Sequence, residues 1–118
     1  MKVWLDNVEL FAALFAAAIH DVSHSGTTNN FHVMTKSNLA NLYNDRSVLE
    51  NFHLTTGFGV CAKEESNILA GLNDEQFFNF RNIVIGNVLF RIFTYSVYKS
   101  LKLKLINRRK KDENLCQI

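Results

Sequence analysis

The chain of 118 residues contains no proline and only two cysteines. Because proline is the strongest breaker of helix interiors, its absence favours a helical chain. Neither Cys61 nor Cys116 follows a signal peptide, since the first seven residues lack a basic stretch followed by an apolar one. Both thiols are therefore expected to be free and unreactive in a reducing, cytoplasmic compartment, which argues against a small secreted domain built on disulfides.

Long apolar runs are also absent. The run at residues 10–19 is too short to span a bilayer, and Asn87 and Arg91 interrupt the one at 83–98. We therefore expect buried helices and no membrane anchor. Basic residues gather at one end, with seven Lys or Arg against two Asp or Glu in residues 99–118. This end is interpreted as a solvated segment, in preference to a nucleic-acid contact or a membrane-surface helix over 83–111.

Apolar residues recur every three or four positions in several stretches, as expected for amphipathic helices. One predicted helix covers residues 4–21, and another begins after Asn73 or Asp74 as its N-cap. Between them, residues 23–30 are rich in Ser, Thr, Asn and Gly and are expected to form a loop. The predicted fold class is all-α.

Three shorter segments are less regular. A short helix capped by Ser37 is expected within residues 31–43, and a helical turn within 64–69. A longer helix is expected to begin near Arg46, with Asp45 as its cap, and to be interrupted or ended by the glycines at 57 and 59. In residues 101–105 Leu alternates with Lys and no core pattern follows, so we expect a frayed or disordered tail.

The residues Ile19-His20-Asp21-Val22-Ser23-His24 carry the chemistry. Imidazole and carboxylate are ligands that suit zinc, and a carboxylate can also bridge to magnesium or manganese. His24 lies four positions after His20, so the two rings share a face if the helix continues. A zinc site takes at least three protein ligands, so the spacing leaves a metal site and a hydrogen-bonded pair at a helix end equally open.

Two sequence blocks resemble one known family. Residues 11–32 carry the His-Asp signature followed by Ser-Gly-Thr-Thr-Asn-Asn-Phe-His, and residues 42–51 read Leu-Tyr-Asn-Asp-Arg-Ser-Val-Leu-Glu-Asn. In this order they resemble the catalytic domain of class I cyclic-nucleotide phosphodiesterases, most closely the calmodulin-dependent type. The resemblance covers about residues 4–89 and implies a partial, HD-type helical domain, an incomplete bundle followed by a divergent basic segment at 90–118.

The resemblance also implies roles for individual residues. His20 and Asp21 would hold zinc, with Asp21 bridging to magnesium or manganese, and His24 would hydrogen-bond the metal-bound water and the substrate phosphate. Glu50 would orient the histidine that protonates the leaving 3′ oxygen. Asn29 would steady the loop, although Asn is also a common turn former. His53 matches the second histidine of the family's Glu-Asn-His-His.

The chain departs from the family at several points. Phe52 replaces the first histidine of Glu-Asn-His-His, and no counterpart exists for the upstream His-Asn-x-x-His, the downstream metal-binding Asp or the purine-clamping Gln and Phe. The resemblance implies hydrolysis of 3′,5′-cyclic nucleotides, cAMP or cGMP, by the complete protein, with calmodulin as a partner of that protein only. By family the complete protein is an enzyme. Because the general-acid His and a metal-binding Asp have no counterpart here, we expect this chain to be an inactive fragment. The alternative is a non-catalytic helical fragment that binds a partner.

A fragment of a larger helical domain exposes surfaces that the rest of the domain would cover. We therefore expect the side chains of Phe11, Phe15, Phe77 and Phe80 to be partly uncovered, a condition that promotes association.

Overall fold

The computed structural model describes residues 6–90, and these form helices, turns and loops without any strand. The predicted all-α fold class is confirmed for this range. The divergent basic segment, its Leu-Lys alternation and Cys116 lie outside the described residues. The elements in chain order are α1 (Asn7–Ile19), α2 (Asn29–Met34), α3 (Asn38–Leu42), α4 (Val48–Cys61), the 3-10 turn η1 (Glu64–Ser66) and a helix over residues 74–90.

Side-chain caps set the beginnings of four helices, including α2, where Oγ1 of Thr28 accepts a hydrogen bond of 3.1 Å from the backbone N–H of Phe31. Asp6 and Glu9 form a capping box at the start of α1, each accepting a hydrogen bond of 2.8 Å from the other's backbone N–H. Ser37 caps α3 by accepting a hydrogen bond from the backbone N–H of Ala40, which confirms its prediction. Asn73 makes the same reciprocal contact with Gln76 at 2.9 and 3.1 Å, so the cap predicted at 73 or 74 is at Asn73.

The predicted bounds of α4 are wrong at both ends. Asn44, Asp45 and Ser47 have φ values of 54°, 62° and 43°, in the left-handed region, so the helix cannot begin at residue 46 and starts at Val48. The glycines do not end it, because the helix continues to Cys61. Gly57 is needed for packing: a Cβ there would lie 2.8 Å from Cγ2 of Ile19, at the end of α1.

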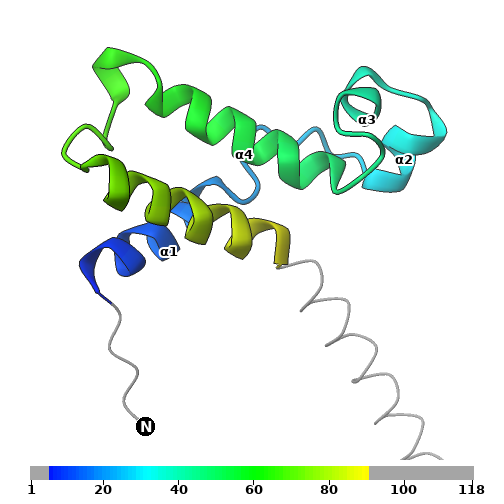
Figure 1. Cartoon of the computed structure of the whole chain (residues 1–118). Helices are drawn as coiled ribbons and strands as arrows, with labels where there is room; N and C mark the ends of the chain where they lie inside the picture. The colour runs from blue at the N-terminus through cyan, green and yellow to red at the C-terminus, as the bar shows by residue number, and fades with distance from the viewer. Residues whose placement is uncertain (1–5, 91–118) are drawn as a thin grey trace, which may run out of the picture.

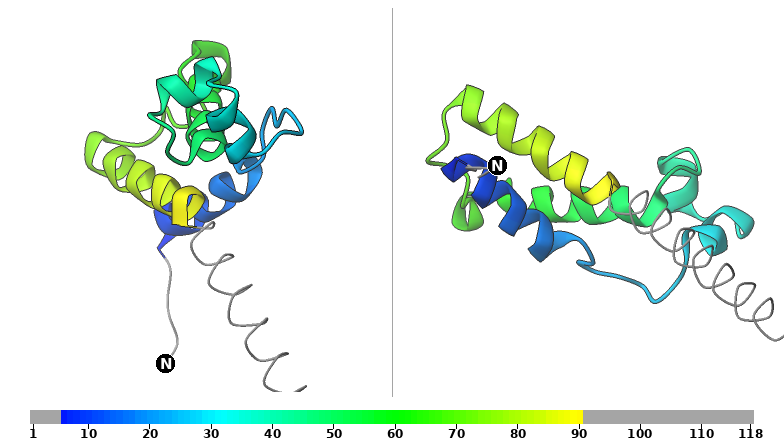
Figure 2. Two further views of the ribbon diagram at one scale, coloured as in Figure 1. Left: turned by 90° about the vertical axis from the view of Figure 1, so that its right-hand side faces the viewer. Right: turned by 90° about the horizontal axis from the view of Figure 1, so that it is seen from below.

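Three helices carry the body of the fold. Helix α4 and helix 74–90 run in opposite directions along the molecule, and α1 lies against both (Figure 1). The short helices α2 and α3 sit together beside the N-terminal end of α4, away from the turn at η1 (Figure 2). The loop after α1 leads to α2, and two of its residues, Val22 and His24, contact His53 of α4. Within residues 6–90, no helix is long and apolar enough to cross a membrane.

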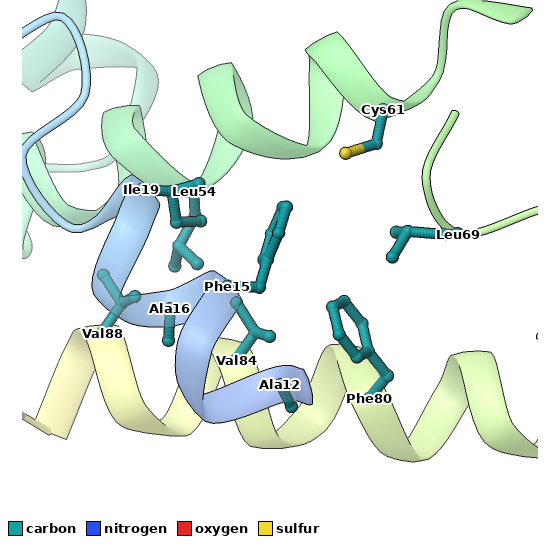
Figure 3. Close-up of a cluster of buried hydrophobic side chains, with 10 residues drawn as sticks. All are labelled: Ala12, Phe15, Ala16, Ile19, Leu54, Cys61, Leu69, Phe80, Val84 and Val88. Carbon is teal, nitrogen blue, oxygen red and sulfur yellow. The ribbon is translucent and has the colours of Figure 1, made fainter. Parts of the chain in front are cut away.

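The core forms where these three helices meet, and Figure 3 shows its buried side chains. Phe15 packs against Phe58 and Phe80 with ring centroids 5.6 and 5.4 Å apart. Phe15 is 7% exposed and Phe80 0% exposed, so the expectation that both are uncovered is wrong, whereas Phe77 is 40% exposed. The buried cluster comprises Ala12, Phe15, Ala16, Ile19, Leu54, Cys61, Leu69, Phe80, Val84 and Val88.

Candidate functional site

The candidate site begins where α1 ends. The helix stops at Ile19, and His20 is its C-terminal cap residue. The backbone N–H of Val22 donates to the carbonyl of Ile19 at 3.0 Å, and that of His24 donates to the carbonyl of Asp21 at 3.2 Å. Ser23, with φ 57°, reverses the chain. These turns end α1 at Ile19, directly before His20, and bring the Asp21 carboxylate to the His20 ring.

The His20 ring lies between two oxygen atoms. Its Nδ1 is 2.5 Å from the carbonyl oxygen of Ala17, and its Nε2 is 2.7 Å from Oδ2 of Asp21. A carbonyl and an ionised carboxylate can only accept hydrogen bonds. The contact between Nε2 and Oδ2 has the length of a hydrogen bond, so the structure contains the hydrogen-bonded pair at a helix end that the spacing left open. Because Nδ1–H donates to a backbone carbonyl, Nε2 is the ring atom that would be available to a metal ion.

His24 does not join this pair through helical geometry, because α1 ends before it. Its Nδ1 accepts a hydrogen bond of 2.9 Å from the backbone N–H of Gly26. Its ring instead stacks on that of His53 in α4, with centroids 5.6 Å apart and planes inclined by 26°. His24 is exposed. Its backbone is hydrogen-bonded to that of Asp21, and one face of its ring contacts His53 of α4.

His53 connects α4 to the same turn. It is 2% exposed, and its Nδ1 donates to the carbonyl oxygen of Val22, 31 residues earlier, at 2.7 Å. Since Val22 directly follows Asp21, this hydrogen bond fixes the backbone that carries the candidate ligands. Phe52, which replaces a family histidine, places its ring 6.0 Å from that of His53.

Asn29 and Glu50 form a second connection to α4. The Asn29 amide donates from Nδ2 to Oε2 of Glu50 at 2.9 Å, and its Oδ1 accepts from the backbone N–H of Leu49 at 2.8 Å. Asn29 is thus more than a turn former, since one side chain satisfies a helix N-terminal N–H and orients a carboxylate. The catalytic role assigned to Glu50 stays a prediction, because the histidine it would orient is not among the described residues.

A further buried histidine, His32, is not among the site residues predicted from the sequence. His32 lies in α2 and is 7% exposed. Its Nε2 is 2.7 Å from Oγ1 of Thr27 and its Nδ1 is 2.9 Å from Oγ of Ser37. The signal for this role is the placement of two hydroxyl residues five positions before and after the histidine. His32 therefore joins the loop after the candidate site to the cap of α3.

The ligand set is partial. Among residues 6–90, no group of three or more His, Cys, Asp or Glu side chains is placed to hold a metal ion. His20 also lines a groove of about 570 Å³ between α1 and helix 74–90, whose other lining residues are Ala13, Ala16, Ala17, Asn87, Val88 and Phe90. Further ligands for an ion at His20 and Asp21 therefore have to come from outside the described residues.

Cys61 is unsuited to nucleophilic chemistry. The thiol is free and buried, and burial raises its pKa above the ordinary value. A raised thiol pKa lowers the fraction of reactive thiolate at neutral pH. The expectation that Cys61 is an unreactive free thiol agrees with this position in the core.

The sequence is similar to one protein family and to individual members of it. The family model for 3′5′-cyclic nucleotide phosphodiesterase matches residues 1–108, further than the 4–89 expected. Dual specificity calcium/calmodulin-dependent 3′,5′-cyclic nucleotide phosphodiesterase 1 from Drosophila melanogaster is 52% identical over 86 residues, which are 73% of this chain and 10% of the relative. The mouse 1C enzyme of the same description is 52% identical over 87 residues, 73% of this chain and 12% of the relative.

Solved structures give the same result for the fold. The phosphodiesterase domain of a rhodopsin phosphodiesterase fusion protein from the choanoflagellate Salpingoeca rosetta superimposes with a TM-score of 0.77 at 36% sequence identity. The superposition covers 91% of this chain and 34% of that domain. The chain thus spans about a third of a solved domain with the same arrangement of helices.

Proposed function

This chain belongs to the 3′,5′-cyclic nucleotide phosphodiesterase family, and from that premise we propose that it supplies part of a two-metal site that hydrolyses cAMP or cGMP to the 5′-nucleotide in the complete protein. The observation that carries the proposal is the contact of 2.7 Å between Nε2 of His20 and Oδ2 of Asp21. These two ligand atoms face each other, and the ring is already anchored through Nδ1 to Ala17.

The proposal gives the pair specific roles. His20 and Asp21 would hold zinc, and the Asp21 carboxylate would also be available to a second ion, magnesium or manganese. When bound, such ions polarise a phosphate and lower the pKa of a bound water so that hydroxide is available at neutral pH. His24, exposed beside the pair, donates a hydrogen bond to a phosphate oxygen of the substrate. Its ring is kept in place by the stacking contact with His53.

The remaining residues act through position. Glu50 accepts a hydrogen bond from the general-acid histidine, which belongs to a part of the domain outside this chain. Asn29 holds Glu50 in place through its amide, and His53 holds the carbonyl of Val22 next to Asp21. Both contacts end on α4, so this helix sets the distance between the metal-binding turn and the residue that orients the acid.

The names of the relatives support two further parts of the proposal. They describe dual specificity, calcium/calmodulin-dependent enzymes. We therefore assign cyclic nucleotides as substrates and calmodulin as a partner to the complete protein only. A cytoplasmic location remains the prediction made from the sequence. The alternative is a non-catalytic helical fragment that binds a partner. It has the same fold, and the two alternatives differ in whether the segment supports hydrolysis.

A chimera tests the proposed function. Residues 6–90 replace the matching segment of the Drosophila relative, and hydrolysis of cAMP and cGMP is measured in the presence of Zn²⁺ and Mg²⁺. We expect an active chimera and loss of its activity on His20→Ala, whereas the isolated chain is inactive, because loss of a general acid alone reduces rates by about 10²–10⁴.

Metal content separates the role of His20 from folding. Zinc bound by the folded chimera is measured by mass spectrometry of the metal, and His32→Gln serves as a matched control away from the pair. We expect His20→Ala to lower zinc content and His32→Gln to retain it. An active chimera whose zinc and turnover survive His20→Ala would falsify the assignment, and a folded but inactive chimera would favour the non-catalytic alternative.

A further inference from the structure

A second groove lies between α4, the connection through η1 and helix 74–90. Its volume is about 560 Å³, and it shares no lining residue with the groove beside His20. We call it the Arg81 groove. Its lining residues are Asn51, Leu54, Thr55, Phe58, Gly59, Cys61, Ala62, Asn67, Leu69, Phe77, Arg81 and Ile85.

Arg81 is the only charged residue in this lining. Its guanidinium carbon lies 4.4 Å above the centroid of the Phe58 ring. Within residues 6–90 the single ion pair is that of His20 with Asp21, so Arg81 has no carboxylate partner there. Stacking on an aromatic face leaves the five N–H donors in the guanidinium plane available, and these match a carboxylate in a two-point contact.

The rest of the lining restricts what accompanies the anion. Leu54, Leu69 and Ile85 form apolar walls, and Phe77 is 40% exposed at the edge. The backbone N–H of Leu69 already occupies Oδ1 of Asn67, and Asn51 donates to the carbonyls of Arg46 and Ser47. The groove therefore suits an apolar segment that carries one Asp or Glu, and a strongly hydrophilic anion would leave the walls unfilled.

We propose that the Arg81 groove receives an acidic, apolar segment from the part of a phosphodiesterase domain that lies outside this chain, with its carboxylate paired to Arg81. The chain spans 34% and 32% of two solved domains of this fold, so about two-thirds of each has no counterpart in this chain and is available to cover its exposed surfaces. The proposal rests on family membership and the groove, and is independent of the catalytic roles of His20 and Asp21.

Chemical labelling of arginine tests whether the groove is covered. Phenylglyoxal labelling of Arg81 is compared by mass spectrometry in the isolated chain and in the chimera with the Drosophila relative, with exposed Arg46 as the internal reference. We expect the ratio of Arg81 to Arg46 labelling to fall roughly tenfold or more in the chimera, because an ion-paired guanidinium inside an interface is shielded. An unchanged ratio would show that the groove is an open surface and would overturn the proposal.

Charge variants test the nature of the contact. In the chimera, Arg81→Gln is expected to lower the melting temperature by roughly 4 °C or more, because it leaves a carboxylate unpaired. Arg81→Lys should recover part of this loss, and Arg46→Gln should leave the melting temperature unchanged. If Arg81→Gln is neutral or stabilising, no carboxylate faces Arg81 and the proposal is wrong.

A second preparation covers the case in which the chimera does not fold. If the chimera does not fold, the labelling ratio is measured on this chain co-purified with the relative's domain lacking the matching segment, and an unchanged ratio again rejects the proposal. Labelling and melting do not depend on turnover. A chimera that is inactive but protects Arg81 would therefore contradict the proposed function alone.

Discussion

Asn29 shows how much one polar side chain can fix in this molecule. It lies at the first position of α2, yet both ends of its amide contact α4, 20 and 21 residues later. The backbone N–H of Leu49 donates to the Asn29 amide oxygen, and Leu49 is 5% exposed, so water cannot easily take the place of this acceptor. A backbone donor that loses its partner in a buried place costs the full desolvation of that group.

We predict that Asn29→Ala destabilises the chain by about 1–3 kcal/mol, because the N–H of Leu49 loses its acceptor and Glu50 its donor. Asn30→Ala is the matched control, since Asn30 is the exposed neighbour in the same helix. Urea unfolding followed by circular dichroism measures both variants. Equal effects of the two substitutions would mean that the amide contacts contribute nothing to stability.

At the scale of the element, α4 is the part that connects the candidate site to the core. Its N-terminal half carries Glu50 and His53, and Gly57 in its second half contacts the end of α1. The missing side chain at Gly57 lets Ile19 approach the backbone of α4. Since Ile19 directly precedes His20, this contact also sets how closely the end of α1, and with it the candidate ligands, approaches α4.

The two glycines of α4 provide a matched pair of substitutions. Gly59→Ala, with nothing within 4 Å of the new Cβ, is expected to stabilise the helix by up to about 1 kcal/mol. Gly57→Ala gains the same propensity but places a Cβ 2.8–3.0 Å from three atoms of Ile19. Overpacking of this kind costs about 1–3 kcal/mol, so the net effect is destabilising.

Thermal unfolding of the two variants checks the prediction, and zinc content of the chimera carrying Gly57→Ala reports whether His20 has moved. A Gly57→Ala variant as stable as Gly59→Ala would show that Ile19 can relax at no cost.

Much of the helical structure could be predicted from the sequence, for local reasons. The Asn73 cap and the Ser37 cap are visible because a capping side chain contacts a backbone N–H only three residues away. The bounds of α4 could not be predicted, because the left-handed residues before Val48 and the tolerance of Gly57 depend on contacts with other elements. Periodicity contains no information about either.

The candidate site divides in the same way. The His20–Asp21 contact joins neighbouring residues and was visible as a motif. The contacts of His53 with Val22 and of His24 with His53 span 31 and 29 residues, and only the fold brings these pairs together. Resemblance suggested that His53 matters, but it did not indicate that a backbone carbonyl is its partner.

At the scale of the whole molecule, the described residues expose several large apolar side chains. Leu10 and Leu14 are 50% and 63% exposed one turn apart on α1, and Phe78 on helix 74–90 is 69% exposed. A monomeric protein seldom leaves such residues grouped in water. In a complete domain, elements outside this chain would cover them.

We predict that the isolated chain self-associates at micromolar concentration, which sedimentation velocity over a dilution series measures. The double substitution Leu14→Gln with Phe78→Gln should shift the chain toward monomer. Met34→Gln is the control, because Met34 is 72% exposed on α2 at the other end of the molecule. A chain that sediments as a monomer at every concentration would contradict this expectation.

The hydrogen bond from His53 to Val22 has a consequence for how related sequences vary. Its acceptor is a main-chain carbonyl, which every amino acid supplies, so the hydrogen bond itself does not restrict the side chain at position 22, whereas position 53 has to keep a side chain that donates there. The two residues touch, yet their substitutions should show no covariation in an alignment of the family. Methods that infer contacts from correlated changes would therefore overlook the hydrogen bond that holds the His20–Asp21 turn to α4.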